Sequence, residues 1–206
     1  MRLSLTGRLF GRVKEGFIHA IRRAKQKYEF HLYALCMMSN HVHYLIEPAR
    51  QEDLPRIMHW LNWYSAMCFN RMLKRTGHFW EQRYHSSAFP TDDRKRALNT
   101  LRYIHANPRV AGITRSFIYR YSNYGIYAKL SDERLTTWHP AFLELGDTLE
   151  KCASRYRRCT GEEECCRKPR ADHGHIAKRE RVSLLSVQSG SGTGGAKTAR
   201  DRPDER

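Results

Sequence analysis

Long hydrophobic runs are missing from this sequence, and acidic residues are scarce beside basic ones. The mean hydropathy is −0.72, and no apolar stretch approaches the roughly 18 residues that a membrane span requires. Residues 1–8 lack the apolar segment of a secretory signal, so export is not expected. The 6 cysteines among 206 residues are too sparse for a secreted disulfide scaffold. We therefore expect a cytoplasmic protein that does not bind membranes.

Aromatic residues are absent from residues 160–206, and every Phe, Tyr and Trp of the chain lies before this segment. The segment also contains a Gly- and Ser-rich run over 189–195, a composition typical of flexible linkers. A segment with so little to bury cannot offset the entropy lost on ordering. We predict a folded domain over residues 1–159 and a disordered tail over 160–206.

The cysteines and histidines near the C-terminus raise an alternative for the tail. The residues in question are Cys152, Cys159, Cys165, Cys166, His173 and His175. Their spacing matches none of the regular zinc-finger patterns. A zinc-dependent regulator is therefore kept only as an alternative to a structureless tail.

Positive charge is concentrated in the predicted domain. The chain has 37 Lys and Arg against 21 Asp and Glu, a formal charge of +16. Because the tail has ten basic and eight acidic residues, +14 belongs to the domain. This distribution favours a surface for a polyanion, whereas a solvated basic face without a partner is the alternative. The basic residues expected to contact DNA are Arg22, Arg23, Lys25, Arg83, Arg94, Lys95, Arg96 and Arg102.

The spacing of apolar residues predicts three helices, a hairpin and a further strand. The helices are expected over 10–24, from Asp53 to Gly77, and from Thr91 to Asn107–Pro108. The strands are expected over 30–38, 41–47 and 79–89. A tyrosine-rich stretch over 119–127 has no clear period and is not assigned. Such an alternation favours an α+β fold, an antiparallel sheet with helices on one face.

His41 and His43 flank Val42 in the second predicted strand. Because side chains alternate along a strand, both imidazoles point to one face. Two neighbouring imidazoles are a natural pair of ligands for a divalent metal. The alternative is a pair of half-exposed histidines without a function, since His-x-His alone is not a specific pattern.

A second polar group lies at the end of the third predicted helix. At about 100° per residue, Tyr103 and Asn107 share one face with Arg96 and Asn99, away from the apolar stripe. A tyrosine beside an amide and a guanidinium is better placed for chemistry than for core packing. A packed surface tyrosine is the alternative.

Together these two groups suggest a phosphoryl-transfer site. A phenol has a pKa near about 10 and is a weak nucleophile at neutral pH. A divalent metal held by His41 and His43, with the carbonyl oxygen of Asn107 as a candidate third ligand, would polarise a scissile phosphate for attack by Tyr103. A phosphotyrosyl intermediate would conserve bond energy for rejoining without a nucleotide cofactor.

Three motifs in order resemble the single-tyrosine transposases of the HUH (His-hydrophobic-His) superfamily, the IS200-like group and its REP-associated branch. Residues 37–46 read MMSNHVHYLI, residues 77–84 read GHFWEQRY, and residues 103–112 read YIHANPRVAG. The resemblance covers roughly residues 8–158. The order and spacing of the three motifs make it more specific than any one of them.

The resemblance implies a ferredoxin-like antiparallel sheet and a transposase that depends on Mg²⁺ or Mn²⁺. Its substrate would be single-stranded or hairpin DNA, cleaved through a 5′-phosphotyrosine intermediate. By position, His41 and His43 match the metal-binding histidines and Tyr103 matches the nucleophile. Asn107 falls where relatives carry a polar residue proposed to complete the metal site. A monomer and a homodimer both remain open.

The chain departs from the resembled family at its N-terminus. Relatives begin with a strand before the first helix, and here only residues 3–5 resemble its remnant. In a ferredoxin-like order that strand would lie in mid-sheet, beside the strand with the histidine pair. We therefore expect either a misassigned start codon or a decaying copy with unpaired backbone groups beside the site. The alternative function is an inactive single-stranded nucleic-acid-binding protein.

Overall fold

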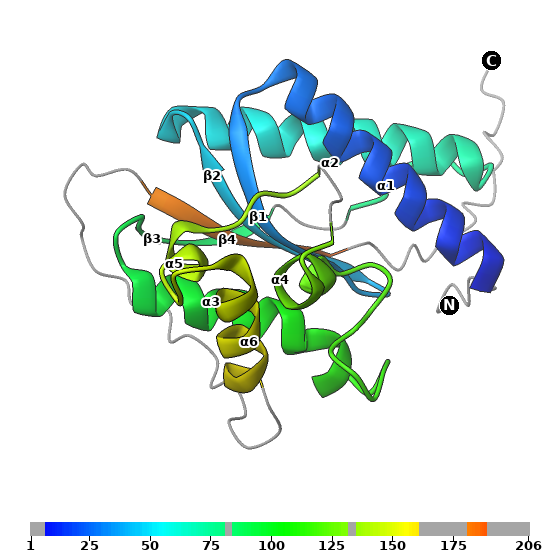
Figure 1. Ribbon diagram of the computed structural model, residues 1–206. Helices are drawn as coiled ribbons and strands as arrows, with labels where there is room; N and C mark the ends of the chain where they lie inside the picture. The colour runs from blue at the N-terminus through cyan, green and yellow to red at the C-terminus, as the bar shows by residue number, and fades with distance from the viewer. Residues whose placement is uncertain (1–6, 81–83, 132–134, 161–180, 189–206) are drawn as a thin grey trace, which may run out of the picture.

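The computed structural model describes residues 7–80, 84–131, 135–160 and 181–188. Figure 1 traces the elements from blue at the N-terminus to red at the C-terminus. The helices are α1 (Gly7–Lys27), a 3-10 turn (Gln51–Asp53), α2 (Leu54–Met72), α3 (Arg94–Val110), α4 (Tyr124–Lys129), α5 (Pro140–Leu143) and α6 (Leu149–Cys159). The strands are β1 (Phe30–Met37), β2 (His41–Pro48), β3 (His85–Pro90) and β4 (Arg181–Gln188). No helix within these ranges combines the length and the apolar character needed to cross a bilayer.

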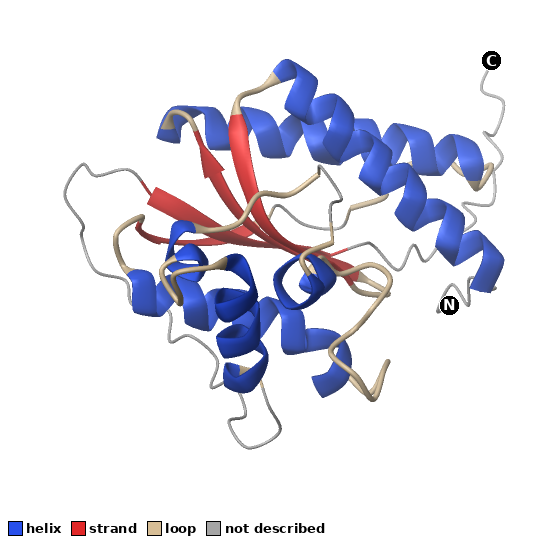
Figure 2. Ribbon diagram, in the orientation of Figure 1, coloured by secondary structure: helices blue, strands red, loops and turns tan. Residues whose placement is uncertain are grey.

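The four strands form one antiparallel sheet in the order β1-β2-β4-β3. Figure 2 shows the sheet between two helical layers, with α1 and α2 on one side and α3 to α6 on the other. The α+β class and the antiparallel sheet are confirmed. The expectation that helices cover one face only is wrong, because both faces of the sheet carry apolar side chains that need cover.

Alternation along β2 divides its side chains between two hydrophobic cores. Val42, Tyr44 and Ile46 belong to the core under α1 and α2. Leu45 belongs to the core under α3 to α6, and His43 points to that same side because strand positions two apart share a face. The sequence therefore directs the histidine pair toward α3.

β4 corrects the prediction of a disordered tail for residues 181–188. This strand pairs with β2 from His41↔Gln188 to Ile46↔Ser183, and with β3 along its other edge. It thus fills the mid-sheet position that the resemblance assigns to a first strand. Composition averaged over 160–206 concealed the run RVSLLSVQ, which is rich in residues suited to a strand. Thr160 is described as the residue that caps the end of α6, whereas residues 161–180, 189–206 and 3–5 lie outside the described residues.

Several element boundaries differ from the predictions, among them the end of α2, which lies at Met72 instead of Gly77. α3 continues through Pro108 to Val110, and Asp93 caps its start by accepting a hydrogen bond from the Arg96 backbone N–H at 3.0 Å. Pro108 is tolerated because it costs one backbone hydrogen bond in the last turn. β3 begins at His85 instead of residue 79, because Phe79 packs into the core under α1 and α2.

Candidate active site

The two histidines meet at the start of β2. The Nε2 atoms of His41 and His43 lie 3.0 Å apart, and their ring centroids are separated by 4.7 Å. His43 is buried and His41 is half-buried. The prediction that both imidazoles share a face is confirmed.

Hydrogen bonds define the tautomer of one ring and leave the other with an unpartnered nitrogen. His41 Nδ1 lies 2.8 Å from Asn40 Oδ1, and because an amide oxygen only accepts, this nitrogen carries the proton. His41 Nε2 then has a lone pair directed at His43. Within the described residues, the buried Nδ1 of His43 has no hydrogen-bond partner.

Burial keeps both imidazoles neutral. Desolvation lowers the pKa of His41. Desolvation, followed by the neighbouring His41, lowers the pKa of His43 to about 4. A neutral ring offers a nitrogen lone pair, which is the form that binds a metal.

Tyr103 lies against the histidine pair. Its ring centroid is 5.7 Å from that of His43, and the two rings are steeply tilted at 75°. α3 is oriented by its buried stripe of Ala97, Leu101 and Ile104, which packs in the core with β1 and β2. The stripe turns Tyr103 toward β2, where it remains half-buried. Residues 60 positions apart in the sequence thus meet, as the motif pattern predicted.

Asn107 follows one helical turn after Tyr103. Its side-chain Nδ2 donates a hydrogen bond to the Tyr103 carbonyl at 2.7 Å, and the residue is half-buried. This contact fixes the amide beside the tyrosine. Ligation of a metal by Asn107 stays a prediction.

The histidine pair suits two adjacent positions on a cation. A metal that takes two nitrogens at about 2.1 Å and at right angles separates them by about 3.0 Å, which agrees with the 3.0 Å between the Nε2 atoms. Across the described ranges, no group of three His, Cys, Asp or Glu side chains gathers at one point. Among the described residues, the site therefore offers two imidazoles as metal ligands. An amide oxygen or water molecules would complete the coordination of the cation.

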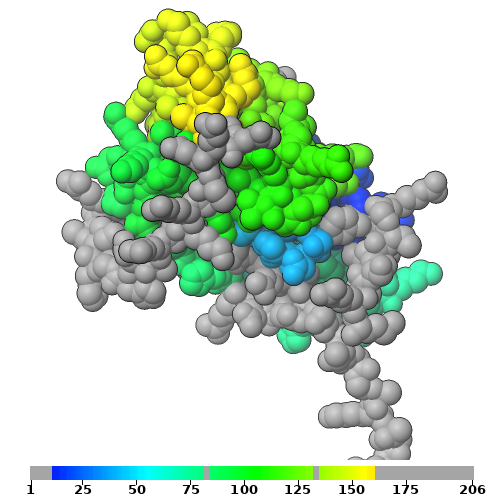
Figure 3. Space-filling model, turned by 90° about the horizontal axis from the view of Figure 1, so that it is seen from below, coloured from blue at the N-terminus to red at the C-terminus, as the bar shows by residue number. Residues whose placement is uncertain are grey.

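The site lies at the edge of the layer formed by α3. Viewed from below (Figure 3), the light-blue surface around the turn between β1 and β2 lies beside the green surface of α3 and its following loop. The start of β2 is therefore close to the molecular surface on this side.

The first turn of α3 carries three of the basic residues predicted to contact DNA. Arg96 donates to the Ser87 hydroxyl on β3 at 3.3 Å, which holds it beside the sheet. Arg94 forms an ion pair with Glu144 at 2.8 Å, and Lys95 is exposed. These side chains share a helix with the tyrosine, so they lie on the same side of the sheet as the histidines.

The predicted contacts on α1 lie on the opposite face of the sheet (Figure 1). Arg22 and Arg23 are exposed there. The ammonium of Lys25 donates to the Leu135 carbonyl at 2.9 Å and is half-buried, which gives it a structural role. The structure does not bring this group together with the histidine pair.

Arg102 is also engaged apart from the histidine pair. Arg102 donates to the Cys159 carbonyl through two guanidinium nitrogens, at 3.1 and 2.8 Å, and so links α3 to α6. Arg83 lies outside the described residues. For the zinc alternative, Cys152 is buried and Cys159 is exposed, and the remaining cysteines and histidines of that group also lie outside them.

Sequence reasoning assigned no role to His105, which anchors α3. This ring is fully buried, with Nδ1 2.8 Å from the Tyr156 hydroxyl and Nε2 2.9 Å from Asn123 Oδ1. Asn123 also donates to the Tyr33 carbonyl of β1 at 2.8 Å. The network joins α3 to β1 and α6. The only sequence signal was a histidine within the motif that contains the tyrosine.

Comparisons with known proteins agree with the geometry. The sequence model of the family described as "Transposase IS200 like" matches residues 6–107. This range contains the hairpin with the histidine pair and α3 as far as Asn107. No curated protein and no solved structure matched the chain.

Proposed function

Because residues 6–107 belong to the IS200-like transposase family, we propose that the protein is a metal-dependent single-tyrosine transposase that cleaves and rejoins single-stranded DNA. The observation that carries the proposal is the convergence of three side chains. His41 and His43 meet through their Nε2 atoms at 3.0 Å, and the Tyr103 ring packs on His43 at 5.7 Å. A nucleophile beside a pair of metal ligands is the arrangement that phosphoryl transfer requires.

His41 and His43 would hold the divalent cation, Mg²⁺ or Mn²⁺, with Asn107 as the proposed further ligand. The lone pair of His41 Nε2 and the 3.0 Å separation of the two Nε2 atoms support this assignment. A bound cation would supply positive charge that polarises the scissile phosphate.

Tyr103 is the proposed nucleophile. Its hydroxyl oxygen forms a bond to the phosphorus, and the bond from phosphorus to the 3′ oxygen breaks. The phenol loses its proton, and the departing 3′ oxygen gains one. The 5′ end of the DNA stays on the tyrosine, and a 3′-hydroxyl can later attack the phosphotyrosine and reseal a strand. No nucleotide cofactor is needed, because the phosphotyrosine bond conserves the energy.

Basic residues of α3 are the proposed contacts for the DNA backbone. Arg96 is held at β3 by Ser87, and Lys95 is exposed on the adjacent surface. Phosphate contacts of this kind position a strand without reading its sequence. A single strand or a hairpin lying along α3 would bring its phosphate to Tyr103.

The alternative, an inactive nucleic-acid-binding protein, was motivated by the expected gap in the sheet beside the histidine strand. β4 occupies that position and pairs with the residues from His41 to Ile46. The backbone beside the pair is therefore hydrogen-bonded on both edges of β2. This observation favours an active enzyme over the binding protein.

The test is covalent capture of labelled hairpin DNA in the presence of Mn²⁺, resolved on denaturing gels. We expect an adduct with the natural sequence and none with Tyr103→Phe or His41→Ala. Matched controls are Tyr64→Phe and His59→Ala, whose side chains lie on α2 across the sheet. DNA binding without an adduct in any variant would establish the alternative.

A further inference from the structure

A basic cavity lies beyond the family-matched region, between the end of α3, the loop that follows it, α4 and α6. Its volume is about 300 Å³, within the range of about 300–1,000 Å³ found for small-ligand sites. The side chains that define its character are Arg109, Arg115, Lys129, Arg157, Phe117 and Tyr124. None of its described lining residues is acidic. The cavity is therefore suited to an anion.

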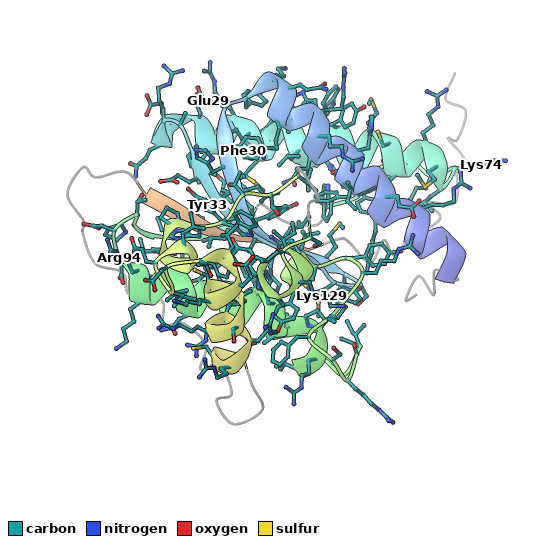
Figure 4. The ribbon with its side chains drawn as sticks, in the orientation of Figure 1. Glu29, Phe30, Tyr33, Lys74, Arg94 and Lys129 are labelled. Carbon is teal, nitrogen blue, oxygen red and sulfur yellow. The ribbon has the colours of Figure 1, made fainter. Side chains whose placement is uncertain are left out.

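Its cations come from four separate parts of the chain. Arg115 and Lys129 are exposed, and Arg157 donates a hydrogen bond to the Ala128 carbonyl. Arg109 is half-buried. Figure 4 places Lys129 on the side of the sheet where α3 to α6 lie, opposite Lys74. Like charges gathered from distant segments repel one another, and a bound phosphate would relieve that repulsion.

Aromatic side chains, those of Phe117 and Tyr124, also line the cavity. The guanidinium of Arg109 lies 5.0 Å from the centre of the Phe117 ring, whose centroid is 5.5 Å from that of Tyr124. The Tyr124 hydroxyl is held 3.2 Å from the Thr160 hydroxyl. Ile118 is 49% exposed and also lines the space. Cations beside aromatic and apolar side chains are the combination that binds a nucleotide by phosphate and base together.

The cavity is connected to the proposed active site through α3. Arg109 follows Tyr103 by six residues, which corresponds to about 9 Å along the helix axis. A strand whose phosphate lies at the tyrosine can therefore reach the cavity within a few nucleotides, since an extended chain spans this distance easily.

We propose that this cavity binds one nucleotide of the DNA single strand, with the phosphate at the four cations and the base against Phe117. That the bound strand is DNA rests on the proposed function. The cavity would bind the strand and would take no part in its cleavage. The cavity would hold the strand at a fixed distance from the cleaved phosphate.

The test measures binding of a fluorescein-labelled oligothymidylate by anisotropy, without divalent metal and at several salt concentrations. The pocket variant is Arg115→Gln with Lys129→Gln. The matched control is Arg158→Gln with Arg71→Gln, two exposed residues that lose the same charge and do not line the cavity. We expect the pocket variant to bind about tenfold more weakly, with a salt slope lower by about 1.4. Phe117→Leu should weaken binding about fivefold or more and leave the salt slope unchanged.

Equal affinities for the pocket variant and the control would overturn the proposal, and so would an unchanged affinity for Phe117→Leu. Circular dichroism melting checks that each variant is folded, and Phe117→Tyr keeps the ring should the leucine variant be unstable. These outcomes are independent of cleavage. If affinity depends on the cavity residues but no covalent adduct forms, the nucleotide-binding proposal stands and the transposase chemistry is contradicted. If an adduct forms but affinity does not depend on the cavity residues, the transposase chemistry stands and the nucleotide-binding proposal is contradicted.

Discussion

His41 and His43 differ in how their rings are held, although both come from one strand. The ring of His41 is oriented by its hydrogen bond to Asn40 at 2.8 Å. His43 has no such partner for Nδ1 among the described residues, and packing against Tyr103 orients it instead. A polar neighbour that fixes a ligand ring usually strengthens metal binding.

We predict that Asn40→Ala weakens Mn²⁺ binding about tenfold, because the His41 ring loses its orienting partner. His43→Ala should weaken it further, by about a hundredfold or more, since one of two imidazole ligands is lost. Isothermal titration calorimetry with Mn²⁺ measures both affinities. His59→Ala, on the opposite face, serves as the control. Unchanged affinity in His43→Ala would remove the pair from the metal site.

α3 depends on a buried network for its position, in addition to its apolar stripe. His105 bridges Tyr156 of α6 and Asn123, and Asn123 is bound to β1. Since Tyr103 lies two residues before His105 on the same helix, the network positions the tyrosine without touching the reacting atoms.

We predict that His105→Ala lowers the free energy of unfolding by about 2–4 kcal/mol, because it leaves a cavity and removes two buried hydrogen bonds, to Tyr156 and to Asn123. Urea denaturation measures this change. His85→Ala, at an exposed position on β3, is the control and should change stability by less than about 0.5 kcal/mol. A similar effect for both substitutions would mean that the network contributes nothing specific.

β4 is one of the two central strands of the sheet, because it hydrogen-bonds to both β2 and β3. Within the described residues these two strands have no direct pairing with each other. Removal of β4 would therefore separate the histidine strand from β3.

We predict that Leu184→Pro destabilises the protein by about 3 kcal/mol or more, since proline cannot donate to the ladder of a central strand. Hydrogen exchange followed by mass spectrometry should show lost protection over residues 41–46. Ser191→Pro, in the Gly- and Ser-rich run, is the control. Full protection of β2 in Leu184→Pro would contradict the central position of β4.

At the scale of the whole molecule, two histidines are buried on the α3 side of the sheet, and protonation of either ring opposes folding. Desolvation lowers the pKa of His105 to about 4, and desolvation likewise lowers that of His139 to about 4. Both side chains are fully buried. In the unfolded chain an ordinary histidine titrates near about 6.5.

We predict that stability falls as the pH drops from about 6.5 to about 4. In this window the unfolded chain binds protons that the folded chain does not, at a cost of about 1.4 kcal/mol per pH unit for each histidine. Above the window both states are neutral and this contribution is constant. Denaturation curves at several pH values, compared with His139→Gln, measure the slope. A flat profile would mean that the rings titrate freely in the folded state.

Local features of the molecule follow from its sequence, whereas most contacts between distant segments do not. The contact of His43 with Tyr103 is an exception, because the motif pattern predicts it. The hairpin and the buried stripe of α3 follow from residue spacing, so the positions of His41, His43 and Tyr103 are predictable from the sequence alone. β4 pairs with strands more than ninety residues away, and no local pattern reveals such a partner. Lys25 and Arg102 have the sequence character of DNA contacts, yet they donate to backbone carbonyls, because burial of a cation against a carbonyl depends on tertiary packing.

The central claim is that the histidine pair and Tyr103 share one cation, and fluorine NMR tests it most directly. The protein is labelled with 3-fluorotyrosine, and Tyr103→Phe identifies the resonance of residue 103. Added Mn²⁺ should broaden this signal before the other tyrosine signals, and the combined substitutions His41→Ala and His43→Ala should abolish the selectivity. Uniform broadening of all tyrosines, or a sharp Tyr103 signal with Mn²⁺ bound, would contradict the account.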